Sequence, residues 1–386
     1  MDGSDRLTLR VIDSLAKVPS AAWDACAGTN PFVGHAFLQA LEESGSATDE
    51  TGWLSRHLLL EDGAGTLIGA APLYLKSHSY GEYVFDHGWA AAYEHAGGRY
   101  YPKLQVAVPF TPVPGPRLLL RPNAMADATC SLIAGLIEVA KRSEVSSLHV
   151  TFPTAADCDA LAEAGFLRRV GRQFHWENHG YRSFDEFLAA LNARKRKQIR
   201  RERREANATV AIEMLSGGGL KTRHWDAFFR FYISTSDRKW GSPYLTREFF
   251  DLLGQRMADK VLLVMAKHDG RYVAGALNLI GPDTLYGRNW GCIGDFPFLH
   301  FEACYYRAIE FAIASGLKRV EAGAQGAHKI QRGYLPQPTY SAHWIRDPGF
   351  RRAVEDFLRR EAVAVENEME ELVEGLSPFR RENDGP

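Results

Sequence analysis

Apolar positions along the chain follow the same plan in two separate regions. In His57–Ser77 and in Lys260–Gly281, two apolar runs flank a short turn that contains glycine, and the second turn is Asp269-Gly270. Alternating runs around such a turn predict a β-hairpin. Each hairpin is followed by an extended stretch, a stretch of helical periodicity and a short strand. The helices are expected over Ala124–Ser143 and Phe298–Ser315, and the strands over Ser146–Phe152 and Lys318–Ala324.

The repeated order of strands and helices predicts an α/β fold whose sheet has mixed strand direction. We therefore expect two domains, residues 1–178 and 179–348, followed by a helix and tail over 349–386. The second domain contains a basic helical segment, residues 183–206, in which Ser183 and Glu186 have the spacing of a capping box. From Gly349 to Leu376 the apolar residues keep the spacing of one amphipathic helix.

The composition is that of an ordinary globular protein. The chain has 386 residues, of which 45% are hydrophobic, and a formal net charge of -1, so it is long enough for two domains. Its five cysteines are scattered and form no Cys-x-x-Cys pair, which favours reduced thiols in a cytoplasmic protein. The sequence shows neither a secretory signal pattern nor a membrane-spanning apolar run. We expect a cytoplasmic protein, with peripheral contact at the inner face of the membrane left open.

The region Thr284–Trp344 combines aromatic, ionisable and amide side chains with seven glycines. Packing alone does not account for this mixture, because buried strands favour valine and isoleucine. Polar groups on a backbone that approaches a ligand closely would produce such a composition. We therefore expect the functional site in this region.

Several motifs carry a resemblance to a known family: YYPKLQVAVPFTPVPGPRLL, QFHW, KWGSPYL, HFEACYYRAIEFAI, EAGAQGAHK and RGYLPQPTYSAHW. They are similar to the FemAB-like family of predicted N-acyltransferases, which is often labelled peptidoglycan biosynthesis/recognition. The element order in each half resembles the GNAT (acyl-CoA N-acyltransferase) fold, and its duplication resembles the Fem-type transferases. The resemblance implies transfer of an acyl group to a primary amine. The donor would be acyl-CoA or acyl carrier protein, acting as a co-substrate without a permanently bound cofactor.

Some relatives of this family are associated with ceramide synthesis, in which a fatty acyl group is attached to a sphingoid amine. The resemblance therefore favours a long-chain or other lipid amine as the acceptor. Two alternatives stay open. One is aminoacyl-tRNA-dependent transfer to a peptidoglycan precursor, with tRNA ranked below an acyl thioester as donor. The other is a non-catalytic protein that binds a cell-wall or lipid ligand.

Attack of an amine on an acyl thioester needs a group that accepts a proton from the amine. Glu321 is the first candidate, because a carboxylate at the end of a central strand faces the crevice where α/β sheets bind ligands. His328, in the loop that follows, is the second. His300 and Glu302 lie on the first turn of the expected helix, where a histidine tends to stay neutral. Both residues also have a structural alternative. His300 would then donate a hydrogen bond to a backbone carbonyl, and Glu302 would be a solvated acid at the surface.

The turn between Trp290 and Phe298 contains Gly291 and Gly294. The resemblance to the GNAT fold implies that this turn holds the pyrophosphate of the donor. The usual Arg/Gln-x-x-Gly-x-Gly/Ala motif is not evident there, which leaves acyl carrier protein and aminoacyl-tRNA open as donors. The side chains of the region that are expected to bind substrate are Arg288, Trp290, Gln325, Lys329 and Arg332.

The first half contains a second polar and aromatic cluster, followed by a proline-rich loop. Four prolines between Pro109 and Pro116 stiffen the loop, because proline fixes φ. Such a rim suits a groove for an elongated acceptor or acyl chain, and a structural connector is the alternative. The residues expected to contact substrate here are Asp86, His87, Tyr101, Lys103, Phe110, Thr111 and Arg117.

The helical segment 183–206 is strongly basic from Arg194 to Arg204. Its charge would attract acyl carrier protein, tRNA, a nucleotide-sugar precursor or anionic lipid headgroups, and a solvated helix is the alternative. Arg194, Lys195 and Arg200 are the expected phosphate- or donor-binding side chains.

The sequence contains no motif for metal binding or for a serine nucleophile. His300, Glu302, His328 and His343 have no metal-ligand spacing such as His-Glu-x-x-His. A Gly-x-Ser-x-Gly elbow is also absent. We therefore expect neither a bound metal nor a serine nucleophile.

Overall fold

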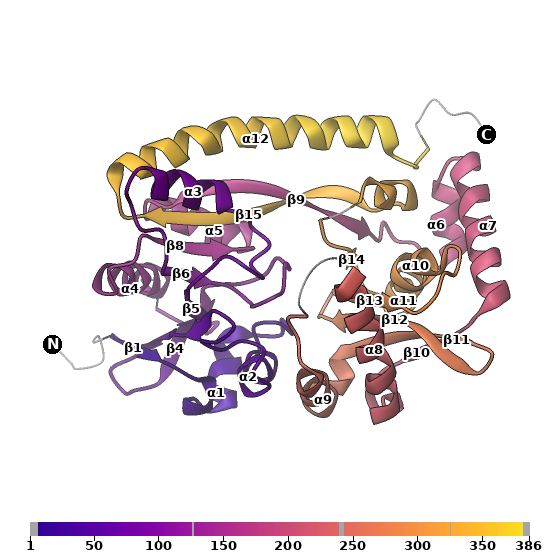
Figure 1. Ribbon diagram of the computed structural model, residues 1–386, viewed down its shortest axis with the longest axis horizontal. Helices are drawn as coiled ribbons and strands as arrows, with labels where there is room; N and C mark the ends of the chain where they lie inside the picture. Colours follow the sequence, from indigo (N-terminus) through magenta and orange to yellow (C-terminus); the bar gives the residue numbers. More distant parts are fainter. Residues whose placement is uncertain (1–6, 126, 239–242, 325, 381–386) are drawn as a thin grey trace. The chain divides into compact units, whose positions relative to one another are not determined.

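The computed structural model describes residues 7–125, 127–238, 243–324 and 326–380. The chain divides into two units (Figure 1). Unit 1 contains the residues up to Gly171 together with Thr339–Val365, and unit 2 contains Arg172–Pro338 together with the residues from Glu366 onward. Strands β9 (Leu167–Glu177) and β15 (Leu335–Ile345) and helix α12 (Pro348–Leu376) have residues in both units. The sequence patterns predict domain boundaries at residues 178 and 348. The two units have different boundaries, because the chain returns to unit 1 after Pro338.

Unit 1 contains two groups of paired strands. The smaller sheet has the order β1-β3-β4-β7, and the larger group has the order β2-β5-β6-β8 followed by the end of β15. The strands are β1 (Thr8–Ile12), β2 (Trp53–Ser55), β3 (His57–Glu61), β4 (Leu67–Ala71), β5 (Leu73–Lys76), β6 (Lys103–Val106), β7 (Leu119–Leu120) and β8 (Ser147–Thr151). The helices are α1 (Ser20–Ala27), α2 (His35–Glu43), α3 (His87–His95), α4 (Ala128–Arg142) and α5 (Ala155–Glu163).

The two faces of the larger sheet in unit 1 have opposite character. Side chains alternate between the faces of a strand. On one face, apolar residues of β5, β6 and β8 form a buried core with Leu132 and Leu136 of α4. On the other face the strands carry buried polar and ionisable residues, namely Lys76, Lys103, Gln105, His149 and His343. The register places these residues on neighbouring strands, because Lys76 pairs with Lys103, Gln105 with His149, and His149 with His343.

Unit 2 contains strands in the order β10-β11-β12-β13-β14-β9. All neighbours are antiparallel except β13 and β14, which are parallel. The strands are β10 (Ala211–Leu215), β11 (Val261–His268), β12 (Arg271–Ile280), β13 (Thr284–Cys292) and β14 (Arg319–Glu321). The helices are α6 (Phe184–Ala190), α7 (Ala193–Thr209), α8 (Thr222–Arg238), α9 (Arg247–Arg256), α10 (Leu299–Phe301) and α11 (Arg307–Ala314).

The predicted fold class is confirmed. Both hairpins are present, as β3–β4 and β11–β12. The expected helices are α4 and the continuous helical stretch Leu299–Ala314, and the strands that follow them are β8 and β14. In unit 1 β6 runs parallel to β8, and in unit 2 β13 runs parallel to β14. Within the described residues, none of the helices combines the length and the apolar character needed to cross a membrane.

Candidate active site

Glu321 is the last residue of β14 and its carboxyl group is buried. Its Oε2 atom has no hydrogen-bond partner among the described residues. The nearest imidazole nitrogen, Nε2 of His175, lies 4.0 Å away and also lacks a partner in the described part of the chain. Burial raises the pKa of Glu321 to about 8, although the positive charge of Arg319 opposes this. Burial lowers the pKa of His175 to about 3, so both groups are mainly neutral at neutral pH.

The sheet around Glu321 is irregular. Strands β13 and β14 pair only as far as Tyr286 and Glu321, whereas β13 continues to Cys292. A β-bulge interrupts the register between β12 and β13, and Arg288 is its extra residue. Bulges redirect side chains and are common beside functional sites. The positive charge of Arg288 acts on Glu321 and lowers its pKa slightly against the effect of burial, so Arg288 belongs to the same site.

His300 and His328 lie near each other, although they come from different elements. Their ring centroids are 6.2 Å apart, and the Tyr305 hydroxyl lies 3.1 Å from Nε2 of His328. The ring of Trp290 lies 5.4 Å from that of His300. Partial burial and the charges of Arg332 and Lys329 lower the pKa of His328. A neutral histidine in this position is able to accept a proton.

The helix that carries His300 has an unusual backbone. It begins after Phe298, which has a left-handed φ of 60°, and it contains a π-helical turn over Glu302–Tyr306. Such π-turns occur often at functional sites. The turn changes which side chains of the helix share a face, and it directs Glu302 into the interior of unit 2.

Glu302 and Arg332 are held in buried ion pairs. Both oxygens of Glu302 accept hydrogen bonds from Arg203, at 3.0 Å each, and Arg307 lies 2.7 Å from Oε1. Arg332 donates to both oxygens of Glu202 at 2.9 Å and to the Tyr306 hydroxyl at 3.0 Å. Because these contacts occupy the polar atoms of Glu302 and Arg332, the geometry favours a structural role for both residues over proton transfer and substrate binding.

Other residues expected at the site also make structural contacts. The Lys329 ammonium donates to the backbone carbonyls of Ala322 and Gly323. A Cβ atom on Gly291 would lie 2.2 Å from the Phe231 carbonyl oxygen, so this glycine permits close packing of α8. Gly294 has a φ of 96°, which glycine adopts readily in a tight turn. Gln325 lies outside the described residues.

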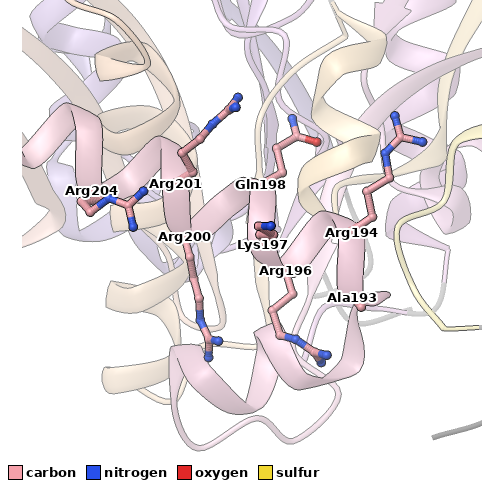
Figure 2. Close-up of a pocket in the computed structure, with 8 residues that line it drawn as sticks. All are labelled: Ala193, Arg194, Arg196, Lys197, Gln198, Arg200, Arg201 and Arg204. Carbon is pink, nitrogen blue, oxygen red and sulfur yellow. The ribbon is translucent and has the colours of Figure 1, made fainter.

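The three basic residues expected to bind a donor lie on α7 and differ in their surroundings. Lys195 donates to Oε1 of Gln331 at 2.8 Å. Arg200 makes an exposed contact of 3.3 Å with Asp185. Arg194 is exposed, forms no ion pair within the described residues, and lines a hollow on α7 (Figure 2).

In unit 1, Asp86 and Lys103 belong to a buried ionic network. The Lys103 ammonium donates to Ser79 and Glu82 at 2.7 Å each and to Asp86. Burial lowers the pKa of Lys103, but the charges of Glu82 and Asp86 outweigh this, and its pKa lies above the usual value. Tyr101 joins the network through a 2.8 Å hydrogen bond between its hydroxyl group and that of Ser79.

The proline-rich loop of unit 1 is a packed connector. Phe110 and Thr111 are buried, and the Phe110 ring packs against Trp53 at 5.4 Å. The Arg117 guanidinium donates to the carbonyls of Thr151, at 2.9 Å, and of Val113, at 2.7 Å. The structural alternative therefore fits these three residues better than a substrate rim does. His87, at the start of α3, is exposed.

The sequence patterns did not predict two groups of residues, one beside Glu321 and one beside Lys103. His175 stands opposite Glu321 in the register of β9 and β14. Lys76 and Glu82 lie beside Lys103, where burial lowers the pKa of Lys76 to about 7 and raises that of Glu82 to about 7. The sequence offers only the alternation of side chains along each strand as a signal. Alternation indicates on which face of the sheet a residue lies, but not which residue lies opposite it on the neighbouring strand.

The model of the FemAB-like family, described as peptidoglycan biosynthesis/recognition, matches residues 14–381. No curated protein sequence matches the chain.

Similar folds occur among solved structures. The crystal structure of FemX has a TM-score of 0.55 at 12% sequence identity, covering 90% of this chain and 100% of that one. The structure of L-PGS from Bacillus licheniformis has a TM-score of 0.53 at 10% identity, covering 93% and 96%. The C-terminal domain of a putative lysylphosphatidylglycerol synthetase from Agrobacterium fabrum has a TM-score of 0.53 at 10% identity, covering 91% and 97%. Identities this low show a shared fold.

Proposed function

This chain belongs to the FemAB-like family and shares the fold of Fem-type, GNAT-like transferases, and on that basis we propose that it is an N-acyltransferase. The donor is an acyl thioester, carried by coenzyme A or acyl carrier protein. The acceptor is a primary amine, and a long-chain or sphingoid amine is the leading candidate. The observation that supports this proposal most strongly is the buried carboxyl group of Glu321 at the end of β14, whose Oε2 atom has no hydrogen-bond partner among the described residues.

The pKa of Glu321 suits the removal of a proton from an amine. An alkylammonium group has a pKa of about 10.4, and an ordinary glutamate, at about 4.3, is a weak base toward it. With a pKa of about 8, the Glu321 carboxylate is much closer to the ammonium, which makes proton transfer less unfavourable. The buried setting of Glu321 therefore provides the base that the reaction requires.

The reaction proceeds without a covalent enzyme intermediate. Glu321 takes a proton from the ammonium, and the free amine attacks the thioester carbonyl carbon, forming the C–N bond. Arg288, whose charge acts on Glu321, is the group that we assign to the developing oxyanion. The C–S bond then breaks, and Glu321 gives the proton it holds to the departing thiolate. Glu321 accepts the second amine proton and releases it to solvent, which restores the carboxylate. The products are an amide and a free thiol.

Aminoacyl transfer is the second candidate, because two of the similar folds are named L-PGS and a putative lysylphosphatidylglycerol synthetase. In that case the donor is an aminoacyl ester on tRNA. The acceptor is then a lipid or a peptidoglycan precursor.

A direct assay separates these candidates. The purified protein is incubated with palmitoyl-CoA or palmitoyl-acyl carrier protein and sphinganine, and in parallel with aminoacyl-tRNA. Mass spectrometry detects the amide, and a thiol reagent detects thiol release. We expect amide and thiol in equal amounts from a thioester donor. Product from aminoacyl-tRNA alone would establish the second candidate, and ligand binding without turnover of either donor would identify a non-catalytic protein.

A further inference from the structure

Helix α7 carries its positive charges on the side that faces away from the core of unit 2. Ile199, Glu202 and Ala206 are buried and mark the inner side. Successive residues are about 100° apart around an α-helix, so the outward cations span roughly 160° of its circumference and about 15 Å of its length. These cations are Arg194, Arg196, Lys197, Arg200, Arg201 and Arg204.

Buried ion pairs fix the orientation of this helix. Both oxygens of Glu202, on the inner side, accept hydrogen bonds from Arg332 at 2.9 Å. Arg203 pairs with Glu302 at 3.0 Å and with Glu310 at 2.6 Å. Removing either partner of such a pair leaves a buried charge uncompensated. The helix is therefore held with its basic side outward.

The outward cations are poorly compensated. Within the described residues, Arg194, Arg196, Lys197 and Arg204 form no ion pair. Arg200 and Arg201 have only exposed contacts, of 3.3 Å with Asp185 and 3.6 Å with Glu205. Like charges three or four residues apart destabilise a helix. A negatively charged surface would relieve this repulsion.

The outward side forms a shallow hollow that is lined by α7 alone (Figure 2). Arg194 and Arg201 extend to one side of the helix, and Arg196 and Arg200 to the other. Besides the cations, the lining contains Ala193 and Gln198, and no aromatic or acidic side chain among the described residues. Sites for single-stranded nucleic acid usually add aromatic platforms on which bases stack. The broad basic surface of α7 suits a negatively charged plane better than a nucleic-acid strand.

We infer that the outward side of α7 docks the protein onto an anionic lipid bilayer. This inference rests on the proposed function, in which the acceptor is a lipid amine. Each basic residue near an anionic bilayer strengthens binding about fivefold. The docked helix keeps the enzyme at the surface that holds its acceptor.

The test measures vesicle binding without any substrate. The variant Arg196→Gln/Lys197→Gln/Arg201→Gln/Arg204→Gln is compared with the native protein in sedimentation with phosphatidylglycerol-rich vesicles and with neutral phosphatidylcholine vesicles. We expect the native protein to bind only the anionic vesicles. The variant should bind them several hundredfold more weakly, because four contributions of about fivefold each are lost. Raising the salt from 0.1 M to 1 M should release the native protein, since the screening length falls from about 10 Å to about 3 Å.

A matched control has the same change in net charge. Lys17, Arg142, Arg182 and Arg359 are exposed and each lies beside a carboxylate, and their replacement by glutamine should leave vesicle binding within a few-fold of native. Equal loss in both variants would overturn the inference, because net charge alone would then explain it. The double variants Arg196→Gln/Lys197→Gln and Arg201→Gln/Arg204→Gln should each lose about 25-fold, which keeps the test valid if the quadruple variant does not fold.

Failure of the inference and failure of the proposed function are distinguishable. If α7 docks the enzyme, the quadruple variant acylates sphinganine dispersed in detergent at the native rate but loses activity on sphinganine in anionic vesicles. Native vesicle binding by the variant, or binding of bulk tRNA that anionic vesicles do not compete away, would overturn the inference. An inactive native protein that still binds vesicles through α7 would contradict the proposed function alone.

Discussion

In unit 1 the Lys103 ammonium is surrounded by Ser79, Glu82 and Asp86. In unit 2 the Oε2 atom of the buried Glu321 carboxyl has no hydrogen-bond partner among the described residues, and Oε1 lies 4.0 Å from Arg319. Both groups are withdrawn from water, which is unfavourable for a charge. In unit 1 opposite charges offset this, and Lys103 stays charged. In unit 2 the charges of Arg319 and Arg288 offset it only in part, and the pKa of Glu321 rises to about 8. A polar group that adds no stability at its position is a stronger candidate for chemistry than one that anchors a network.

The contrast is not complete, because unit 1 also has unsatisfied atoms. Oε1 of Glu82 and Oδ1 of Asp86 are buried and have no partner among the described residues. Their other oxygens are bound by Lys103, however. The two groups therefore differ because the carboxylates of unit 1 share a buried cation, Lys103. Substitutions that remove Lys103 or Glu321 one at a time should show whether each has a structural or a catalytic role.

The largest effect is expected from Glu321→Gln. The substitution removes the proposed base, so kcat/KM should fall about 10²- to 10⁴-fold, measured as amide formation by mass spectrometry. The native rate should rise with pH up to about 8 as Glu321 loses its proton, and the variant should lose this rise. Stability should be unchanged or higher, because a buried carboxyl group, which is costly to ionise, becomes a neutral amide.

Glu302→Gln is the matched control for Glu321→Gln, since Glu302 is an equally buried carboxylate that is bound by Arg203 and Arg307. It should lower the free energy of unfolding by about 3–5 kcal/mol and leave the rate per folded molecule nearly native. The reverse outcome, with catalysis lost in Glu302→Gln and retained in Glu321→Gln, would exchange the roles assigned to the two acids.

Lys103→Met tests the other centre. Without the ammonium, Glu82 and Asp86 face each other in the interior with no cation between them, and the free energy of unfolding should fall by about 3–5 kcal/mol. Urea unfolding followed by circular dichroism measures this loss. The loss should shrink at low pH, where both carboxyl groups take up protons. A loss of under about 1 kcal/mol at neutral pH would show that the network does not stabilise unit 1 in the way its charges indicate.

The most gradual effect concerns Lys76, whose pKa burial lowers from 10.5 to about 7. Between these values the folded protein binds fewer protons at Lys76 than the unfolded chain does. This group therefore makes stability rise with pH through that window, by up to about 1.4 kcal/mol per pH unit. In Lys76→Met the rise should be absent. Urea midpoints of the native protein and the variant at several pH values provide the measurement, and parallel curves would exclude this role for Lys76.

Local features of the fold were predictable because neighbouring residues determine them. Asp269 and Gly270 connect β11 to β12 with φ values of 48° and 76°, and two positive φ angles are what the tight hairpin turn requires. Ser183 accepts a hydrogen bond from the backbone N–H of Glu186, as the capping-box spacing indicates. Short-range sequence patterns contain enough information for such elements.

The surroundings of the candidate site were not predictable, because they depend on contacts between distant residues. The spacing around Glu302 gives no sign of Arg203, which is 99 residues earlier in the chain. His175 meets Glu321 only through the register of β9 and β14. Glu321 itself could be selected, since its position at a strand end is a local property. Whether a polar residue has a partner is a property of the packed fold.

The return of the chain to unit 1 affects how the protein is made. Strand β8 pairs with Ser341–Ile345 of β15, and in unit 2 the backbone N–H of Asn192 donates to the carbonyl of Pro378. A ribosome releases the chain from its N-terminus, so neither unit has all its segments until these residues have been synthesised. A gene product truncated before residue 339 would leave an edge of β8 uncovered, where strands of other chains pair readily. A chain that stops before residue 339 should therefore be an aggregation-prone polypeptide in place of a separable N-terminal domain.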